Sequence, residues 1–237
     1  MIKRFFLVFF FSFLFCLSFV LGVTPFGANI TEGVSGSASV DIAQGVAAQA
    51  GNVTELNIFG YTVTQSWQGY FGNVSGTIQL SDSADNVMYN WSALSPEGEI
   101  YASTSDSVNW GGIECFNFTS EGESLESYFG ILSDDVDGVD ETFSYSNGHD
   151  LFYTNNIAFE EGVCMSTQLY DNSGGGVDDY FEEVLLWDGG DVVFASLLED
   201  DVLGFDGRGH DFEILVLEDG HGDNNEVTDY YFYVELQ

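Results

Sequence analysis

Carboxylates are the side chains of this sequence best placed to do chemistry, and two acidic stretches bring several of them together. Residues 133–138 (SDDVDG) place oxygen-bearing side chains two positions apart before a glycine, a spacing typical of calcium-binding loops. The pattern stops at the twelfth position, where Ser144 stands in place of the expected glutamate. Residues 219–226 (DGHGDNNE) form a second oxygen-rich turn. The candidate ligands for Ca2+ or another hard cation are Asp135, Asp137, Asp219 and Asp223, and the alternative is an acidic loop that contacts only solvent.

Each of the three histidines follows a glycine and has an aspartate within two residues. A transition-metal or general-base site would require His149, His210 and His221 to converge, with a carboxylate orienting the ring. If the C-terminal strands pair in sequence order, His210 and His221 lie at opposite ends of one strand, roughly 20 Å apart at about 3.3 Å per residue. We therefore expect no shared histidine site.

The familiar catalytic patterns are missing: the sequence has no Gly-X-Ser-X-Gly elbow, no phosphate-binding glycine loop and no His-Glu-X-X-His. Glu182 and Glu183 are neighbours on an expected strand, so they point to opposite faces and cannot act as a pair across one sugar. We expect a protein without catalytic residues and without a required cofactor. The abundance of carboxylates leaves a secreted glycoside hydrolase as the alternative.

The charge of the chain is extreme, with 39 aspartates and glutamates against three lysines and arginines and a net charge of −36. Lys3 and Arg4 precede the first apolar run, and Arg208 is the only later Lys or Arg. The acids are spread along the chain rather than gathered in one tail. Disorder, a calcium-loaded protein and adaptation to molar salt are the competing explanations. A content of 45% apolar and 16% aromatic residues opposes disorder, and the loss of lysine favours salt adaptation. Repulsion of phosphates excludes nucleic acid as a partner.

The amino terminus has the layout of a secretory signal, with two basic residues before a long apolar run. We expect a signal peptide over residues 1–22, cleaved after Gly22. The run approaches the roughly 20 residues that span a bilayer, so an uncleaved membrane anchor is the alternative. Residues 23–52, rich in Gly, Ala, Ser and Thr, are expected to form a tether or a loosely paired leading strand. Residues 53–237 are expected to form a single β-sandwich domain.

Removal of the signal leaves two cysteines, Cys115 and Cys164, which predicts one disulfide in an exported protein. Two buried free thiols are the alternative. Asn-X-Ser/Thr sequons without proline lie in the first half of the chain and are candidate glycosylation sites: Asn29, Asn52, Asn73, Asn90 and Asn117.

Short apolar runs separated by polar turns predict an all-β fold. We expect an antiparallel β-sandwich, jelly-roll or immunoglobulin-like, with at most one or two short helices. The clearest unit contains strands 181–188 and 191–198 around Gly189-Gly190, followed in sequence order by strands 212–217 and 228–236. Other strands are expected at 56–59, 61–71, 77–80, 87–91, 99–103, 142–143, 151–153, 157–159 and 163–165. A helix is expected over 121–132, capped by Ser120 and Glu123.

The aromatic residues allow two interpretations. Trp67, Trp91, Trp110 and Trp187 either fill the core or stack on sugar rings, and core filling is the commoner use in sandwiches. On the last strand Tyr231 and Tyr233 lie opposite the apolar face. They are therefore the best candidates for an exposed aromatic strip, unless a second sheet covers them.

Two stretches carry a resemblance: residues 65–78 (QSWQGYFGNVSGTI), and residues 211–236, which begin DFEILV and end TDYYFYVEL. With the acidic composition, they resemble secreted, surface-associated β-proteins of halophilic and small symbiotic archaea. The resemblance implies an extracellular location and brings no defined activity and no site residues.

These observations together predict an extracellular, salt-adapted glycoprotein, secreted or displayed at the cell surface, with a structural, adhesive or assembly role. Its expected partners are cell-surface proteins, glycans or copies of itself, and a membrane only through a retained N-terminal segment. The alternative is a secreted carbohydrate-binding module or glycoside-active enzyme.

Overall fold

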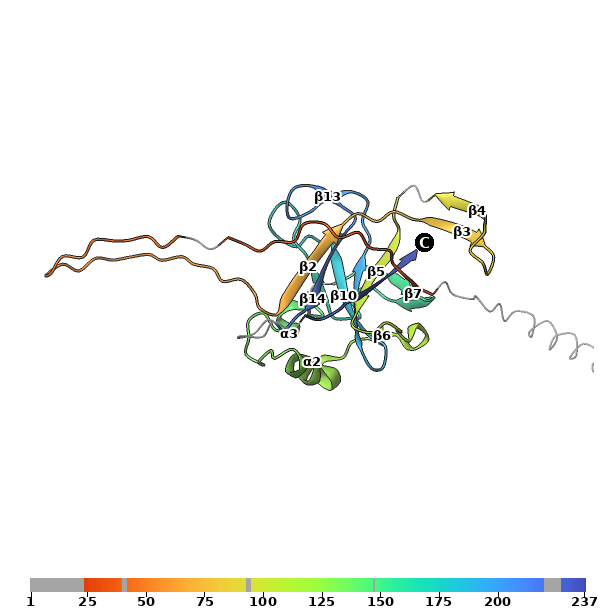
Figure 1. The fold of residues 1–237 in the computed structure, drawn as a ribbon. Helices are drawn as coiled ribbons and strands as arrows, with labels where there is room; N and C mark the ends of the chain where they lie inside the picture. The colour runs from red at the N-terminus through yellow and green to blue at the C-terminus, as the bar shows by residue number, and fades with distance from the viewer. Residues whose placement is uncertain (1–23, 40–41, 93–94, 147, 220–226) are drawn as a thin grey trace, which may run out of the picture.

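The computed structural model describes residues 24–39, 42–92, 95–146, 148–219 and 227–237. The predicted signal peptide therefore lies outside the described residues. One large antiparallel sheet forms the centre of the fold (Figure 1). Its strands run in the order β1 (Phe26–Gly27), β15 (Tyr231–Leu236), β5 (Gly98–Ser103), β11 (Val192–Leu197), β10 (Glu182–Trp187) and β6 (Glu114–Cys115), and β9 (Ser166–Gln168) also pairs with β10. The all-β, antiparallel prediction is confirmed.

The hairpin of β10 and β11 is the predicted one, with Trp187 opposite Val192. Gly189 adopts a φ of 99°, which glycine tolerates because it has no Cβ. The Asp188 carboxylate accepts hydrogen bonds from the backbone N–H groups of Gly190 and Asp191, at 2.9 and 2.8 Å. The turn is thus fixed by its own residues, which is why the sequence could reveal it.

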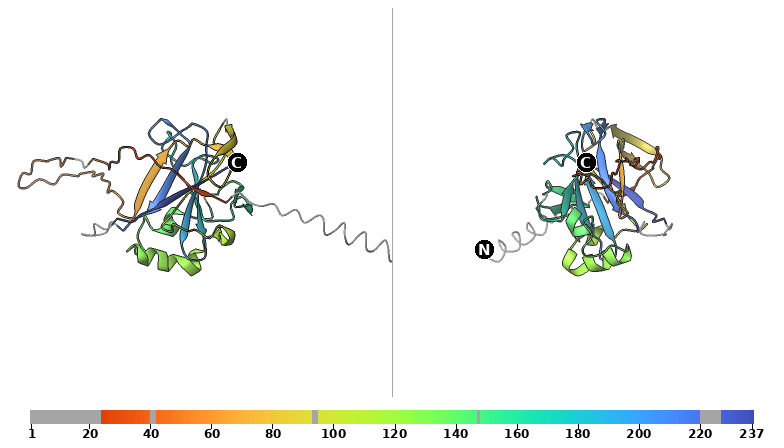
Figure 2. Two further views of the ribbon diagram at one scale, coloured as in Figure 1. Left: turned by 45° about the vertical axis from the view of Figure 1, so that its right-hand side comes forward. Right: turned by 90° about the vertical axis from the view of Figure 1, so that its left-hand side faces the viewer.

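The last strands do not pair in sequence order, contrary to the prediction. β14 (Phe212–Leu217) pairs with β2 (Trp67–Gly72), far upstream, and β15 pairs with β5 and β1. β14 and β2 form a separate two-stranded sheet that faces the large sheet (Figure 2). Apolar periodicity shows which face of a strand is buried, but it does not show which strand is the partner. A prediction that pairs strands in sequence order therefore fails where the chain passes from one sheet to the other.

A first core fills the space between these two sheets. It combines Phe194 and Leu185 of the large sheet with Ile214 and Val216 of β14. On the edge of β14 that faces away from β2, side chains of the large sheet hydrogen-bond to backbone groups. Leu215 N–H donates to the Glu183 carboxyl at 2.8 Å, and Ser196 Oγ donates to the Glu213 carbonyl at 2.9 Å.

A second core covers the opposite face of the large sheet. Here Tyr101 and Tyr233 pack against Trp110, with ring centroids 5.0 and 5.2 Å apart. The hairpin of β7 (Phe152–Thr154) and β8 (Ile157–Phe159) adds its phenylalanines to this layer. Tyr233 is therefore buried and Tyr231 is 45% exposed, so the predicted exposed strip of both tyrosines is wrong.

Helical structure is limited to short segments. A π-helical turn, η2 (Phe118–Gly122), leads into α2 (Glu123–Tyr128), which is shorter than the predicted helix. Asn117 caps η2 by accepting from Thr119 N–H, so the predicted Ser120–Glu123 cap is wrong. Smaller pieces are η1 (Trp110–Gly112) and α3 (Val139–Thr142). Because α3 ends at Thr142 and no strand follows it there, the strand expected at 142–143 is wrong.

The remaining described strands are β3 (Thr77–Ser81) with β4 (Val87–Ser92), and β12 (Val202–Leu203) with β13 (Gly209–His210). Residues 56–66 are not strand, and 163–165 precede the observed β9, so the strands expected there are wrong in position. We name residues 29–65 the arm. Its described residues, 29–39 and 42–65, have no strand assignment, and much of this chain extends away from the body (Figure 1). Among the described residues, no helix has the length and apolar character needed to cross a bilayer.

Candidate functional sites

The first predicted cation loop folds back on the body through its own hydrogen bonds. The Asp135 carboxylate accepts from Leu132 N–H at 2.8 Å. The Asp137 carboxylate accepts from Thr64 Oγ1 at 2.5 Å, and the Asp137 carbonyl accepts from the Trp67 indole at 2.7 Å. These contacts tie the loop to the start of β2 and use the two aspartates in structural roles.

A cluster of three carboxylates lies close to this loop in the sequence and includes neither Asp135 nor Asp137. Glu126, Asp140 and Glu141 each place an oxygen within 4.8 Å of the others. Glu126 is buried and accepts from Val139 N–H at 3.0 Å; burial, followed by the charges of Asp140 and Asp135, raises its pKa. A side-chain hydrogen bond with Asp140 raises the pKa of Glu141. Three such oxygens could hold a hard cation or share a proton. The predicted cation at Asp135 and Asp137 stays a prediction.

A second carboxylate group lies beside the large sheet, where sequence reasoning expected none. Asp150, Asp179 and Glu182 place oxygens within 4.8 Å of one another. Glu182 is buried and accepts from Asp150 N–H at 2.6 Å. Burial, together with the charges of Glu182, Asp150 and Asp179, raises the pKa of nearby Glu199 to about 7.

The second predicted cation loop is mostly outside the described residues. Asp219 is described, and Asp223 and His221 are not. The prediction of a cation at these positions therefore stays a prediction.

Another buried acidic pair is Glu99 and Glu235, which lie opposite each other on adjacent strands β5 and β15. Tyr101 Oη lies 3.4 Å from a Glu99 carboxyl oxygen and 3.3 Å from a Glu235 oxygen. Thr154 Oγ1 accepts from Tyr101 Oη at 3.0 Å, and Asn155 N–H donates to Glu235 at 3.0 Å. The pair thus sits in a closed hydrogen-bonded network beneath the β7–β8 hairpin.

No described cation neutralises this pair. Arg208 is the only lysine or arginine within the described ranges, and it pairs with Asp206. Burial, followed by the Glu235 charge, raises the pKa of Glu99 to about 8. Burial also raises the pKa of Glu235. The pair therefore carries a proton at neutral pH, because two adjacent buried carboxylates cannot both ionise.

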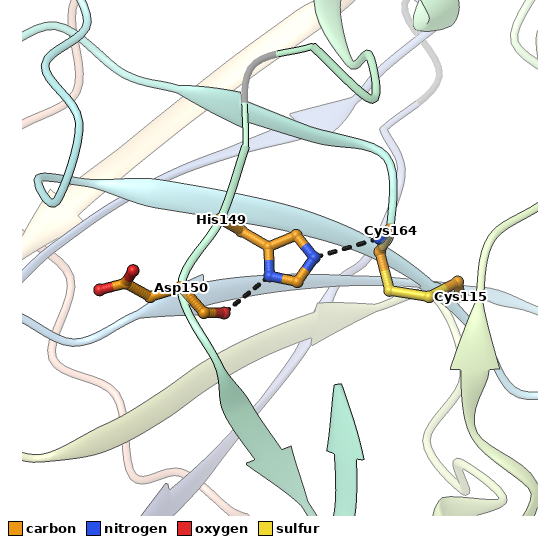
Figure 3. Close-up of a disulfide and its surroundings, with 4 residues drawn as sticks. All are labelled: Cys115, His149, Asp150 and Cys164. Atoms are coloured by element: carbon orange, nitrogen blue, oxygen red, sulfur yellow. Dashed lines mark hydrogen bonds between the residues drawn. A yellow bond between two sulfur atoms is a disulfide. The ribbon is translucent and has the colours of Figure 1, made fainter. Parts of the chain in front are cut away.

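The predicted disulfide is present: Cys115 and Cys164 are bonded, with Cα atoms 5.1 Å apart. His149 lies beside it, as Figure 3 shows. Its Nδ1–H donates to the Asp150 carbonyl at 2.7 Å, and its Nε2 accepts from Cys164 N–H at 3.1 Å. Burial lowers the pKa of His149, so the ring is neutral and structural in this arrangement.

His210 lies in a separate environment. Its Nε2 is 2.9 Å from Asp206, and its ring packs on Phe71 with centroids 4.8 Å apart. His149 and His210 thus have separate hydrogen-bond partners. His221 lies outside the described residues.

All five sequon asparagines are exposed: Asn29, Asn52, Asn73, Asn90 and Asn117. Exposure is a requirement for a glycan acceptor, and glycosylation itself stays a prediction.

Most tryptophans are core residues, as predicted: Trp110 is buried, and Trp67 and Trp187 pack against the first core. Trp91 is the exception, 51% exposed on β4. Trp67 also borders a groove of about 360 Å³ with Tyr70 and Tyr230. Gln65, Gln68 and Glu218 supply polar groups to the same groove.

The arm and the β3–β4 hairpin expose apolar side chains in a region of low charge. Residues 24–98 hold six acidic side chains, and residues 99–237 hold the other 33 of the 39. This division corrects the expectation that the acids are spread along the whole chain. No protein-family model, no curated protein and no solved structure matches this chain.

Proposed function

We propose that this chain is an extracellular, salt-adapted glycoprotein with a structural or adhesive role at a cell surface, where its low-charge N-terminal part contacts other molecules. The observation that carries the proposal is the division of charge and exposed apolar surface. Residues 99–237 form an acidic body around two cores, whereas residues 24–98 contribute the arm and the exposed hairpin. Such a body repels copies of itself, so contacts are favoured where the charge is low.

The arm supports this role because it exposes many large apolar side chains. Those that are large and exposed are Ile30, Val34, Ile42, Val46, Val53, Leu56, Ile58, Phe59, Tyr61 and Val63. Contiguous exposed apolar surface is unusual in a monomeric protein and marks contact sites. The arm also contains only three acids, Glu32, Asp41 and Glu55.

The disulfide is consistent with an oxidising space outside the cytoplasm. An extracellular location also fits the sequons and the basic-apolar amino terminus. The proposed role requires no cofactor and no catalytic residue. Its partners are copies of the chain or other surface molecules.

The test measures the size of the mature chain, residues 23–237, in 2 M NaCl by light scattering and electron microscopy. We expect concentration-dependent association of the wild-type chain. Introducing charge into the arm with Ile58→Asp and Phe59→Asp should weaken it. Val136→Asp is the matched control, because Val136 is equally exposed but belongs to the acidic body. A wild-type chain that stays monomeric, and binds no surface preparation, would contradict the proposal.

The groove beside Trp67 favours carbohydrate binding as a second candidate. Aromatic rings that stack on sugars, next to amide and carboxylate groups, are a common way to bind glycans. Here Tyr70 is 40% exposed, and Gln68 and Glu218 lie along the same groove. A glycan array in molar salt, repeated with Tyr70→Ala, tests it: specific binding that the variant loses would support this candidate.

A further inference from the structure

The β3–β4 hairpin is amphipathic, and its apolar face is uncovered. Ile78 lies opposite Trp91, and Leu80 opposite Tyr89. Residues paired across an antiparallel ladder point to the same side, so these four side chains form one face. They are 47%, 51%, 52% and 60% exposed, respectively, and the Tyr89 and Trp91 rings contact each other with centroids 5.0 Å apart.

The other face of the hairpin is largely polar. Gln79 lies opposite Asn90, and Thr77 opposite Ser92, with Met88 the large apolar residue on this side. Asn90 belongs to one of the sequons. A glycan on Asn90 would therefore project from the polar face and leave the apolar face free.

Two further features indicate that the hairpin is incomplete on its own. The outer edges of β3 and β4 are unpaired within the described residues. An isolated two-stranded hairpin is at best marginally stable in water, and it gains stability when its apolar face is covered. Within the described chain, the four side chains of this face stay 47–60% exposed.

We infer that the apolar face of the β3–β4 hairpin packs against the same face of a second copy of this chain. The inference rests on the proposed function and specifies one contact within it.

The charge of the chain restricts where a second copy can join it. Two acidic bodies repel each other, but the four face residues carry no charge, and the hairpin has only Asp82 and Asp85, both in its turn. In Figure 1 the hairpin lies at the margin of the molecule, away from the arm. Two copies can therefore meet through their hairpins while their acidic bodies stay apart.

The arrangement of side chains on this face also makes it complementary to the same face of a second copy. The aliphatic residues, Ile78 and Leu80, belong to β3, and the aromatic residues, Tyr89 and Trp91, belong to β4. A two-fold axis parallel to the strands, between the packed faces, places β3 of one copy over β4 of the other. Each ring then covers an aliphatic side chain, as an isologous interface requires.

The experiment is sedimentation of the mature full chain, residues 23–237, in 2 M NaCl. The test variant is Tyr89→Thr with Trp91→Thr, which keeps strand-forming residues and retains the Asn90-X-Ser92 sequon. We expect its self-association to weaken about 100-fold or more, because two aromatic anchors are lost. The control, Gln79→Thr on the polar face, should associate as the wild type does. Circular dichroism and the intact disulfide establish that each variant is folded.

Crosslinking supplies a second measurement that does not depend on loss of association. Chains with Leu80→Cys and Tyr89→Cys are mixed and treated with a short bis-maleimide. The two-fold arrangement predicts more crosslinked dimer in the mixture than with either variant alone.

The outcomes separate this inference from the proposed function. If the wild-type chain associates and the face variant associates equally, the inference is overturned while the proposed function stands. If the wild-type chain associates neither with itself nor with surface preparations, the proposed function is contradicted, and the inference that rests on it is contradicted too. Binding of the hairpin face to neutral lipid vesicles, with the chain monomeric in solution, would also overturn the inference.

Discussion

Glu99 and Glu235 lie directly opposite each other across β5 and β15, and both side chains are buried around the hydroxyl of Tyr101. In the folded chain the pair holds a proton that the unfolded chain releases near pH 4.5. A network of this kind stabilises the sheet only while that proton is present.

The first prediction concerns pH. Glu99 has a folded pKa of about 8 and an ordinary value of 4.5. Its raised pKa makes a contribution to stability that is fully present below pH 4.5 and is lost as the pH rises to 8. Between these values the folded chain binds the extra proton, so the free energy of unfolding falls by about 1.4 kcal/mol per pH unit.

Glu99→Gln mimics the protonated acid and should flatten this slope, which leaves the variant more stable than the wild type at pH 8. Thermal melting from pH 5 to pH 9 in 2 M NaCl measures the effect. The control is Glu97→Gln, an exposed acid two residues away. Parallel curves for Glu99→Gln and wild type would show that the pair does not titrate as described.

The second prediction concerns Glu183, which is fully buried and accepts from Leu215 N–H. Burial raises its pKa well above the ordinary value, so the group is neutral. Glu183→Gln keeps an acceptor and should change the free energy of unfolding little at pH 5. Glu183→Leu leaves the Leu215 N–H without its partner and should cost about 1–3 kcal/mol. Denaturant unfolding in molar salt distinguishes the two; equal stabilities would refute the role assigned to this bond.

The third prediction concerns the disulfide between Cys115 and Cys164, which are 49 residues apart. Replacing both by serine should lower the free energy of unfolding by about 4 kcal/mol, because the bond no longer restricts the unfolded chain. The backbone N–H at 164 can still donate to His149 in this variant. Unfolding of the wild type with and without a reducing agent gives the same comparison, and an effect under about 1 kcal/mol would contradict the expectation.

The fourth prediction concerns salt. At 0.1 M ionic strength charges interact over about 10 Å, and at 1 M over about 3 Å. With a net charge of −36, the folded chain should melt at a higher temperature in 2 M than in 0.1 M NaCl. A melting temperature that does not change between these concentrations argues against salt adaptation.

Some features were visible in the sequence because neighbouring residues determine them. The β10–β11 turn is held by Asp188 and glycines within the turn itself. The β3–β4 hairpin follows from two short alternating runs around a polar turn. The disulfide followed from there being only two cysteines beyond the N-terminal apolar run.

Other features depend on which elements pack on each face of a sheet. The alternation of apolar and polar residues along a strand cannot show this. Tyr233 and Glu235 alternate with apolar residues as a solvent-facing strip would, yet Trp110 and the β7–β8 hairpin cover them. No local signal distinguished Glu99 from the many exposed acids. The sequence by itself determined the longer strands of the body, the linked cysteines and the extreme charge. Only the tertiary structure decided that β14 pairs with β2 and that both faces of the large sheet are buried, because strand pairing and burial arise from contacts between residues far apart in the chain.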